Sequence, residues 1–214
     1  MNSSVPWPVR GLYVLTDGPR EDLFEVVSHA LAGGARVLQY RDSTTDAARR
    51  HAEATMLRQL CHEHGAPLII DEDIALAKAV GADGVHLGSE DYDIGAARSE
   101  LGGEAIVGVA CRDSLASATS SARAGASYVS FGAFFPSPTK PLAPRAAIDL
   151  LRQSAALGVP RVAIGGITPD NGTPLIAAGA DFLAAVSAVF GASDVRAEAQ
   201  RFTNMFSTDR ESAR

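Results

Sequence analysis

Eight short apolar runs, separated by longer stretches with helical spacing, limit what this chain can fold into more than any other feature. The runs are continuous rather than alternating, which is typical of strands buried on both faces. They cover 12–15, 37–40, 68–70, 84–87, 105–110, 128–131, 162–164 and 182–186. Strands that alternate with helices pair in parallel through right-handed crossovers. The sequence therefore predicts an α/β fold.

Two of the intervening stretches show the helical pattern most clearly. Residues 23–31 repeat Leu, Val and Ala at the spacing of one helix face. Residues 45–64 are expected to bury one side, with Ala48, Ala52, Met56, Leu57 and Leu60.

Glycines recur one or two residues before several predicted strands. They are Gly34, Gly81, Gly125 and Gly179. Glycine tolerates a positive φ better than other residues, so these positions are interpreted as helix C-caps.

Eight strand–helix units in 214 residues fit one (β/α)8 barrel, the TIM barrel. The alternative is a doubly wound open sheet, which often opens with a G-x-G-x-x-G loop that this sequence lacks. We expect a single domain over 1–214, with loose ends at about 1–9 and 207–214.

Composition excludes several classes of protein. Lys+Arg is 19 and Asp+Glu is 25, a net charge of −6, which argues against a nucleic-acid binder. No apolar run approaches the ~18 residues of a membrane span, and the N-terminus has no apolar segment of a secretory signal. Cys61 and Cys111 lie far apart, so a disulfide scaffold or cysteine-ligated zinc site is not expected. A cytoplasmic protein that binds neither nucleic acid nor membrane is predicted.

Active sites of such barrels lie at the C-terminal ends of the strands, and acidic residues follow two of them. Asp71, Glu72 and Asp73 follow 68–70, and Glu90 and Asp91 follow 84–87. Carboxylates at neighbouring strand ends suit Mg²⁺, but acidic residues also favour helix N-termini. The helix-start interpretation is preferred for Asp73 and Glu90, and both stay open for Glu72 and Asp91.

Candidate anion ligands follow other strands. Gln39 and Arg41 alternate, so they point the same way, and arginine binds phosphate in a bidentate manner. Lys140 follows the hydroxyls of Ser137 and Thr139 in a proline-bracketed loop. Hydroxyl donors together with a point charge favour phosphate binding.

A second phosphate site is expected after the last two strands. Gly165 and Gly166 follow 162–164, and Ser187 follows 182–186. Barrels commonly bind phosphate there through backbone N–H groups. A plain tight turn is the alternative for the two glycines.

Several polar residues favour structural roles. His86 is interpreted as a packed, hydrogen-bonded histidine, and Cys111 as a small apolar filler. Asp17 is expected to cap the first loop. His51, His62 and His64 are expected at the outer surface. The chemistry alone thus indicates a barrel enzyme that transfers a group from a magnesium-bound diphosphate ester and releases pyrophosphate.

The same residues carry a resemblance to the thiamine phosphate synthase family. The matching segments are GLYVLTD from Gly11, LQYRD from Leu38, LIIDEDIALAKAVGADGVHLGSED from Leu68, YVSFGAFFPSPTKP from Tyr128, VAIGGITPDN from Val162 and GADFLAAVSAVF from Gly179. They cover about 10–206 in family order. The resemblance implies a TIM barrel transferase that joins hydroxymethylpyrimidine diphosphate to thiazole phosphate, with Mg²⁺ required.

The resemblance also implies roles for individual residues. Arg41 and Lys140 resemble the catalytic cations that stabilise the leaving pyrophosphate, and Glu72 and Asp91 the magnesium ligands. The implied substrate-binding residues are Gln39, Arg41, Ser43, Asp71, Ala110, Ser137, Thr139, Lys140, Gly166, Val186 and Ser187.

Four of these positions depart from the family pattern, all on the pyrimidine-diphosphate side. The family usually has Lys where this chain has Ser43, Asn-Asp where it has Asp71–Glu72, and Ser where it has Ala110. Ser43 removes a cation and Asp71 adds an anion beside a negatively charged substrate. Each loss is worth about 1.5–3 kcal/mol if a charged hydrogen bond disappears. Arg112 is a candidate replacement for the missing cation.

Two alternatives to the synthase follow from this pattern. A non-catalytic homologue would hold thiazole phosphate or thiamine phosphate without forming the bond. A thiazole tautomerase-like enzyme would carry a histidine at the position of Ala133, so the alanine counts against it. The sequence leaves the oligomeric state open, including a homo-oligomer.

Overall fold

The computed structural model describes residues 5–88, 93–136 and 144–208. The strands are β1 (Gly11–Leu15), β2 (Val37–Tyr40), β3 (Leu68–Asp71), β4 (Gly84–Leu87), β5 (Ile106–Arg112), β6 (Tyr128–Phe131), β7 (Arg161–Ile164) and β8 (Phe182–Ala185). They form a closed barrel in chain order, and β8 pairs in parallel with β1 to complete it. The predicted (β/α)8 barrel is confirmed, and each predicted strand ends within two residues of an observed one.

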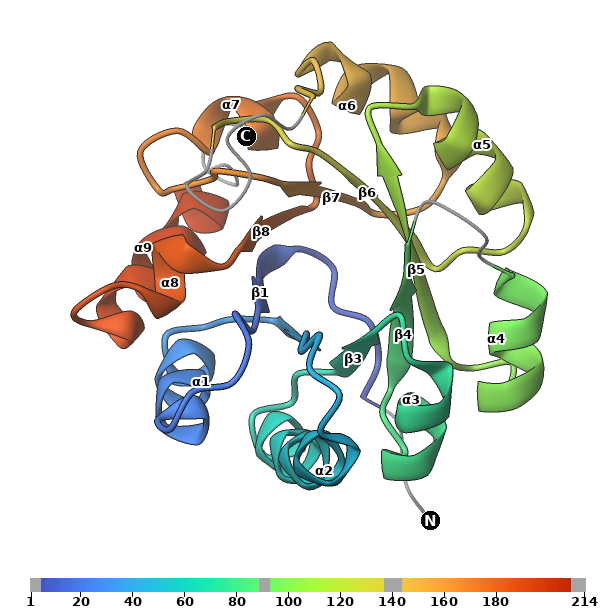
Figure 1. Ribbon diagram of the computed structural model, residues 1–214. Helices are drawn as coiled ribbons and strands as arrows, with labels where there is room; N and C mark the ends of the chain where they lie inside the picture. Colours follow the sequence, from blue (N-terminus) through green and yellow to red (C-terminus); the bar gives the residue numbers. More distant parts are fainter. Residues whose placement is uncertain (1–4, 89–92, 137–143, 209–214) are drawn as a thin grey trace.

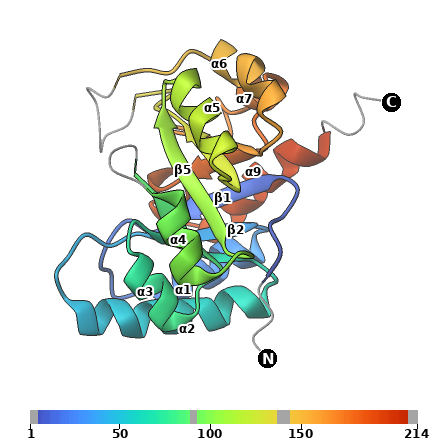
Figure 2. The same ribbon diagram turned by 90° about the vertical axis from the view of Figure 1, so that its right-hand side faces the viewer.

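Helices surround this barrel (Figure 1). They are α1 (Leu23–Ala32), α2 (Ala47–Glu63), α3 (Ile74–Val80), α4 (Ile94–Leu101), α5 (Leu115–Arg123), α6 (Asp149–Gln153), α7 (Thr173–Ala177), α8 (Ser187–Phe190) and α9 (Val195–Thr208). Helix α3 packs between α2 and α4, as Figure 2 shows from the side, and α9 packs against α1. Within the described residues, no helix combines the length and apolar character needed to cross a membrane.

Two apolar cores result, one on each face of the strand layer. The larger core lies between the strands and the helices and includes Leu23, Val27 and Leu31 of α1. The smaller core fills the barrel itself. It comprises Tyr13, Leu15, Val37, Ile69, Ile106, Tyr128, Val162, Phe182 and Ala184. Burial on both faces explains why the strands appear in the sequence as continuous apolar runs.

Trp7 closes the end of the barrel at which the strands begin. Its ring stacks on Tyr128, the first residue of β6, with centroids 4.4 Å apart, and packs 4.9 Å from Phe182, the first residue of β8. Just before it, the Val5 N–H donates to Asp83 at 2.9 Å. Residues 5–7 are therefore held against the barrel, although the sequence predicts loose residues there.

The four glycines expected to end helices all have a positive φ, from +65° at Gly81 to +105° at Gly179. Gly81 is the C-cap of α3, whereas Gly34, Gly125 and Gly179 each follow the C-cap residue by one position. The prediction of left-handed backbone is confirmed at each of them.

The predicted buried face of α2 is wrong except at Leu57 and the partly buried Leu60. Ala54, Leu57 and Cys61 face the core, whereas Met56 is 54% exposed. Arginine, histidine and glutamate recur through most turns of α2, so its apolar residues form no clear stripe. Two small residues, Ala54 and Cys61, allow this helix to lie close to the strands.

Candidate active site

Gln39, Arg41 and Asp71 meet where β2 and β3 end. Gln39 is 3% exposed inside the barrel, and its Nε2 atom donates to Oδ1 of Asp71 at 2.5 Å. Nε of Arg41 lies 3.9 Å from Oδ2 of Asp71. Because both side chains reach the same carboxylate, Gln39 and Arg41 point the same way, as their alternation predicts. This strand end therefore offers an amide, a guanidinium and a carboxylate together.

Thr16, directly after β1, fixes the backbone of Arg41. Its buried hydroxyl accepts a hydrogen bond from the Arg41 N–H at 2.8 Å and donates to the Arg41 carbonyl at 2.9 Å. One side chain thus satisfies both backbone groups of Arg41 where the chain leaves the sheet. This role of Thr16 was not predicted, because a threonine at a strand end has no sequence signature of its own.

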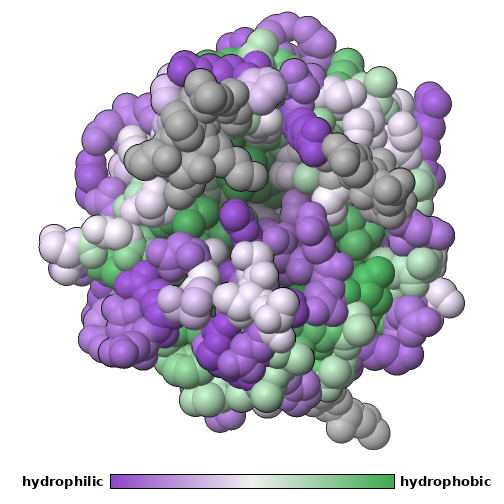
Figure 3. Space-filling view, viewed as in Figure 1, coloured by the Kyte–Doolittle hydropathy of each residue, from purple (hydrophilic) through white to green (hydrophobic). Residues whose placement is uncertain are grey.

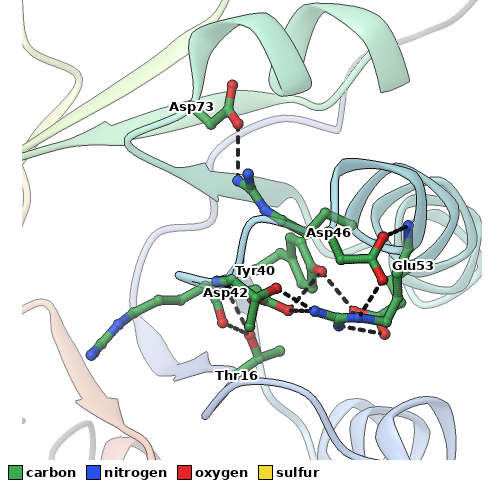
Figure 4. A network of polar contacts seen from close by, with 10 residues as sticks. Thr16, Tyr40, Asp42, Asp46, Glu53 and Asp73 are labelled. Atoms are coloured by element: carbon green, nitrogen blue, oxygen red, sulfur yellow. Dashed lines mark hydrogen bonds and ion pairs between the residues drawn. The ribbon is translucent and has the colours of Figure 1, made fainter.

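A buried carboxylate anchors the loop after Arg41 (Figure 4). The Asp42 side chain is 1% exposed, and its Oδ2 atom lies 2.7 Å from Nη2 of Arg49. The Thr44 N–H also donates to Asp42 at 2.8 Å. Burial alone raises the pKa of Asp42, but the hydrogen bonds from Thr44 and Arg49 outweigh it and hold the pKa below its ordinary value. Asp42 therefore stays charged.

The same arginine extends this network along α2. Nη1 of Arg49 lies 2.9 Å from Glu53, which accepts a hydrogen bond from the Tyr40 hydroxyl at 2.6 Å. Burial, and then the bond to Glu53, raise the pKa of Tyr40, so the phenol stays a donor. The loop that carries Arg41 and Ser43 is thus tied to β2 and α2 at several points.

An ion pair joins α2 to the start of α3. Nη2 of Arg50 lies 2.9 Å from Oδ2 of Asp73, and Figure 4 draws the contact at Asp73 as a dashed line. The other oxygen of Asp73 accepts from the Leu76 N–H at 2.8 Å, so Asp73 is the N-cap of α3. The helix-start interpretation of Asp73 is confirmed.

Glu72 lies between Asp71 and this cap, in an uncommon backbone conformation. Its φ is +58°, in the left-handed region that glutamate rarely adopts, and its N–H donates to the His86 carbonyl at 2.8 Å. Its Oε1 atom lies 2.5 Å from the point where a Cβ on Gly88 would stand. The glutamate thus reaches across to Gly88, just after the end of β4.

The remaining departures from the family pattern lie near the C-terminal ends of β2 and β5, which β3 and β4 separate in the barrel. Ala110 of β5 is half-buried and pairs in register with Ser130 of β6, and Ser43 is exposed in the loop after β2. Arg112, the candidate replacement cation, has a φ of +52° at the end of β5. An unusual backbone at Glu72 and at Arg112 marks the same rim of the barrel.

The two glycines after β7 form a close contact with the loop after β6. Gly165 and Gly166 have φ values of +103° and +63°. A side chain on Gly165 would collide with Ala133, and one on Gly166 with Pro136. Nδ2 of Asn171 donates to the Gly166 carbonyl at 2.9 Å. The backbone thus bends sharply against the loop after β6, and phosphate binding there stays a prediction.

Val186 and Ser187 follow β8 directly. Val186 is half-buried and is the N-cap of α8, and Ser187 is the exposed first residue of that helix. Both lie at a strand end, as expected of the site. The other expected site residues fall outside the described residues. They are Asp91, Ser137, Thr139 and Lys140, together with Glu90 of the acidic set.

Figure 3 shows the face of the molecule seen in Figure 1, hollowed near its centre. Hydrophilic and hydrophobic residues both border the hollow. Among the described residues, no group of three or more His, Cys, Asp or Glu side chains is arranged to hold a metal ion.

A set of tyrosines inside the barrel was not predicted from the sequence. The hydroxyls of Tyr13 and Tyr128 lie 2.8 Å apart, and Tyr13 donates to Gln39 at 2.7 Å. His86 Nδ1 lies 2.9 Å from the Tyr128 hydroxyl, which confirms His86 as a packed, hydrogen-bonded residue. The sequence signal for these contacts was that the tyrosines occupy strand positions that face the barrel interior, as Gln39 does.

The other structural interpretations mostly hold. Cys111 is buried beside Ser121, and burial raises its pKa. Asp17 contacts Arg20 at 3.3 Å in the first loop. His51 and His64 are exposed, as expected. His62 is only partly exposed, because its Nε2 atom lies 3.0 Å from the buried Asp83.

Comparison with known proteins identifies the family. The profile described as thiamine monophosphate synthase matches residues 12–189. The chain belongs to the thiamine monophosphate synthase family. A thiamine-phosphate synthase of Chromobacterium violaceum is 48% identical over 204 residues, 94% of this chain and 99% of that protein. One from Thioalkalivibrio sulfidiphilus is 50% identical over 202 residues, 92% of this chain and 96% of that protein.

Solved structures agree with membership of the thiamine monophosphate synthase family. A thiamine phosphate pyrophosphorylase from Pyrococcus furiosus superposes with a TM-score of 0.83 at 34% identity, covering 92% of this chain and 96% of that one. A 3-hexulose-6-phosphate synthase, at 18% identity and a TM-score of 0.70, covers 91% and 99% and shows the shared fold alone.

Proposed function

We propose that this protein is an active thiamine-phosphate synthase, with hydroxymethylpyrimidine diphosphate and thiazole phosphate as substrates. The bond between the pyrimidine's methylene carbon and the diphosphate oxygen breaks, and that carbon bonds to the thiazole nitrogen. The products are thiamine phosphate and pyrophosphate. The proposal is supported by thiamine-phosphate synthases that are about half identical to this chain over nearly its whole length.

The side chains at the ends of β2 and β3 suit the pyrimidine diphosphate. Gln39 offers an amide to the ring, and Arg41, with its backbone held by Thr16, offers a guanidinium to the diphosphate. Breaking the carbon–oxygen bond builds negative charge on the leaving pyrophosphate, and cations placed beforehand lower that barrier. Arg41 and Lys140 take this role in the proposal, and no strong base is needed.

The carboxylates of Glu72 and Asp91 fit Mg²⁺ by their chemistry. Glu72 reaches the end of β4 beside Gly88, next to the segment that carries Asp91. Magnesium takes one or two carboxylates together with waters and substrate phosphate, so Glu72 and Asp91 would hold it. When bound, the ion neutralises charge on the diphosphate. Glu72 presents its carboxylate one methylene further from the backbone than the aspartate usual in the family.

The thiazole side of the site completes the proposal. Ser137, Thr139, Gly166, Val186 and Ser187 would hold the phosphate of the second substrate. A cytoplasmic location is part of the same proposal.

Incubating the purified protein with both substrates and Mg²⁺, then measuring thiamine phosphate, tests the function. Product formation supports the synthase. Absence of product together with retained binding of thiazole phosphate by calorimetry would overturn it in favour of a non-catalytic binding homologue. That alternative is motivated by the four departures, which all lie on the pyrimidine-diphosphate side. The tautomerase hypothesis is not favoured, because Ala133 stands where that enzyme would carry a histidine and has no group that transfers a proton.

A further inference from the structure

Five side chains form a hydrogen-bonded row across the inside of the barrel. His86 Nδ1 lies 2.9 Å from the Tyr128 hydroxyl, which lies 2.8 Å from the Tyr13 hydroxyl. Tyr13 contacts Oε1 of Gln39 at 2.7 Å, and Nε2 of Gln39 contacts Asp71 at 2.5 Å. The row thus crosses five strands and ends on the carboxylate at the barrel mouth.

The carboxylate end sets the direction of every bond in the row. A carboxylate only accepts hydrogen bonds, so Gln39 turns its NH₂ group toward Asp71 and its carbonyl toward Tyr13. The carbonyl also only accepts, so Tyr13 donates its one hydrogen to Gln39. Tyr13 must then accept from Tyr128, and Tyr128 must accept from His86.

This direction determines where the imidazole of His86 carries its hydrogen. A neutral imidazole holds one N–H, on either Nδ1 or Nε2. The row requires that hydrogen on Nδ1, because Tyr128 has already given its own hydrogen to Tyr13. Reversing the row would place the hydrogen on Nε2 and turn the Gln39 carbonyl toward the Asp71 carboxylate, where two acceptors repel.

The surrounding packing holds the row in place. A Cβ on Gly108 would overlap the ring of Tyr128, so the bare backbone of β5 gives this ring room to reach β4. The Tyr128 ring also stacks on Trp7 at 4.4 Å and on His86 at 5.6 Å between centroids. These contacts leave the tyrosine little freedom to turn away.

We propose that Asp71, acting through this row, fixes the orientation of the Gln39 amide and thereby the donor that the site presents to the pyrimidine ring. Tyr13, Tyr128 and His86 are positioning residues in this arrangement. It rests on the proposed function, since a pyrimidine nitrogen is an acceptor and pairs with an amide N–H but not with an amide carbonyl. The asparagine usual in the family at position 71 both donates and accepts, so it leaves the orientation open.

The direction of the row is measurable without substrate. Nitrogen-15 NMR of the His86 ring in the unliganded protein is expected to show the hydrogen on Nδ1. Asp71→Asn is expected to shift part or all of the population to Nε2. A wild-type ring with its hydrogen on Nε2, or an Asp71→Asn ring identical to the wild type, would overturn the proposal. Phe182→Leu is the packing control, since it loosens the same interior core without a polar change and should leave the tautomer unchanged.

Kinetics then test the consequence for the substrate. Tyr13→Phe removes the hydrogen bond to Gln39, and we expect the KM for the pyrimidine diphosphate to rise about tenfold. The KM for thiazole phosphate should stay unchanged, because a merely loosened core would affect both. If the wild type is active and Tyr13→Phe leaves both KM values unchanged, the positioning role is wrong. If the wild type makes no thiamine phosphate, the proposed function fails, while the NMR result still decides the direction of the row.

Discussion

Arg49 of α2 neutralises the buried carboxylate of Asp42, with Nη2 2.7 Å from Oδ2. Arg49→Ala leaves this charge buried without its cation and loosens the loop that carries Arg41. We expect the melting temperature to fall by about 5 °C and the KM for the pyrimidine diphosphate to rise. Thermal unfolding and steady-state kinetics measure both. Arg152→Ala is the control, because its pair with Asp149 is about 60% exposed on both sides and should contribute little.

Ser43→Lys restores the cation that the family usually has at this position. We expect the KM for the pyrimidine diphosphate to fall about tenfold, because a charged hydrogen bond to the diphosphate is gained. Steady-state kinetics with each substrate varied in turn measure this. Ser99→Lys adds the same charge on the exposed surface of α4 and should change nothing. An unchanged or higher KM in Ser43→Lys would place residue 43 outside the site.

Glu72→Gln tests the proposed magnesium ligand. Losing the carboxylate should raise the Mg²⁺ concentration for half-maximal activity about tenfold, since a neutral amide binds the ion more weakly. A magnesium titration of the rate measures it. Glu104→Gln, an exposed residue, is the matched control. Equal magnesium requirements in both variants would argue against Glu72 as a ligand.

Gly108→Ala places a methyl group in the space that the ring of Tyr128 occupies. We expect the free energy of unfolding to fall by about 2–3 kcal/mol, because the barrel interior has no space for it. Denaturant titration measures the change. The control is Gly103→Ala, whose added Cβ meets no atom within 4 Å, so its effect should stay within about 0.5 kcal/mol. Similar values for the two variants would contradict the tight fit.

His86 should make stability depend on pH. Burial lowers its folded-state pKa to about 4, whereas an unfolded histidine titrates near ~6.5. Between these values the unfolded chain binds a proton that the folded chain does not, so stability falls as the pH falls. The loss reaches about 3 kcal/mol at pH 4 and is absent above about pH 7.

Unfolding free energies from pH 7.5 to 4 measure this loss. His86→Asn should flatten the curve relative to the wild type, whereas the exposed His51→Asn should not. Parallel curves for the wild type and His86→Asn would show that His86 is not the group responsible.

The barrel itself was predictable because parallel strands are covered on both faces. That burial produces runs such as 37–40 and 128–131, and the glycines before strands mark the helix ends. The face of α2 was not predictable, because Ala54 and Cys61 give a weaker apolar signal than Met56, which is exposed.

The placement of Gln39 and Arg41 was predictable, because alternate residues of one strand point the same way. Their roles in binding stay predictions. The roles of Thr16, Tyr13 and Tyr128 were not predictable, because each depends on a partner from another strand. Tyr13 and Tyr128 are 115 residues apart in sequence and touch only because the barrel brings β1 and β6 to face each other across its interior.

The pairing of β8 with β1 has a consequence for how the protein is made. The first strand emerges from the ribosome with one edge unpaired, and its partner on that edge begins only at Phe182. Helix α9, which packs on α1, is synthesised later still. During most of translation the chain therefore exposes an open strand edge, the kind of edge that invites association with other chains. The barrel therefore cannot close until β8 has left the ribosome.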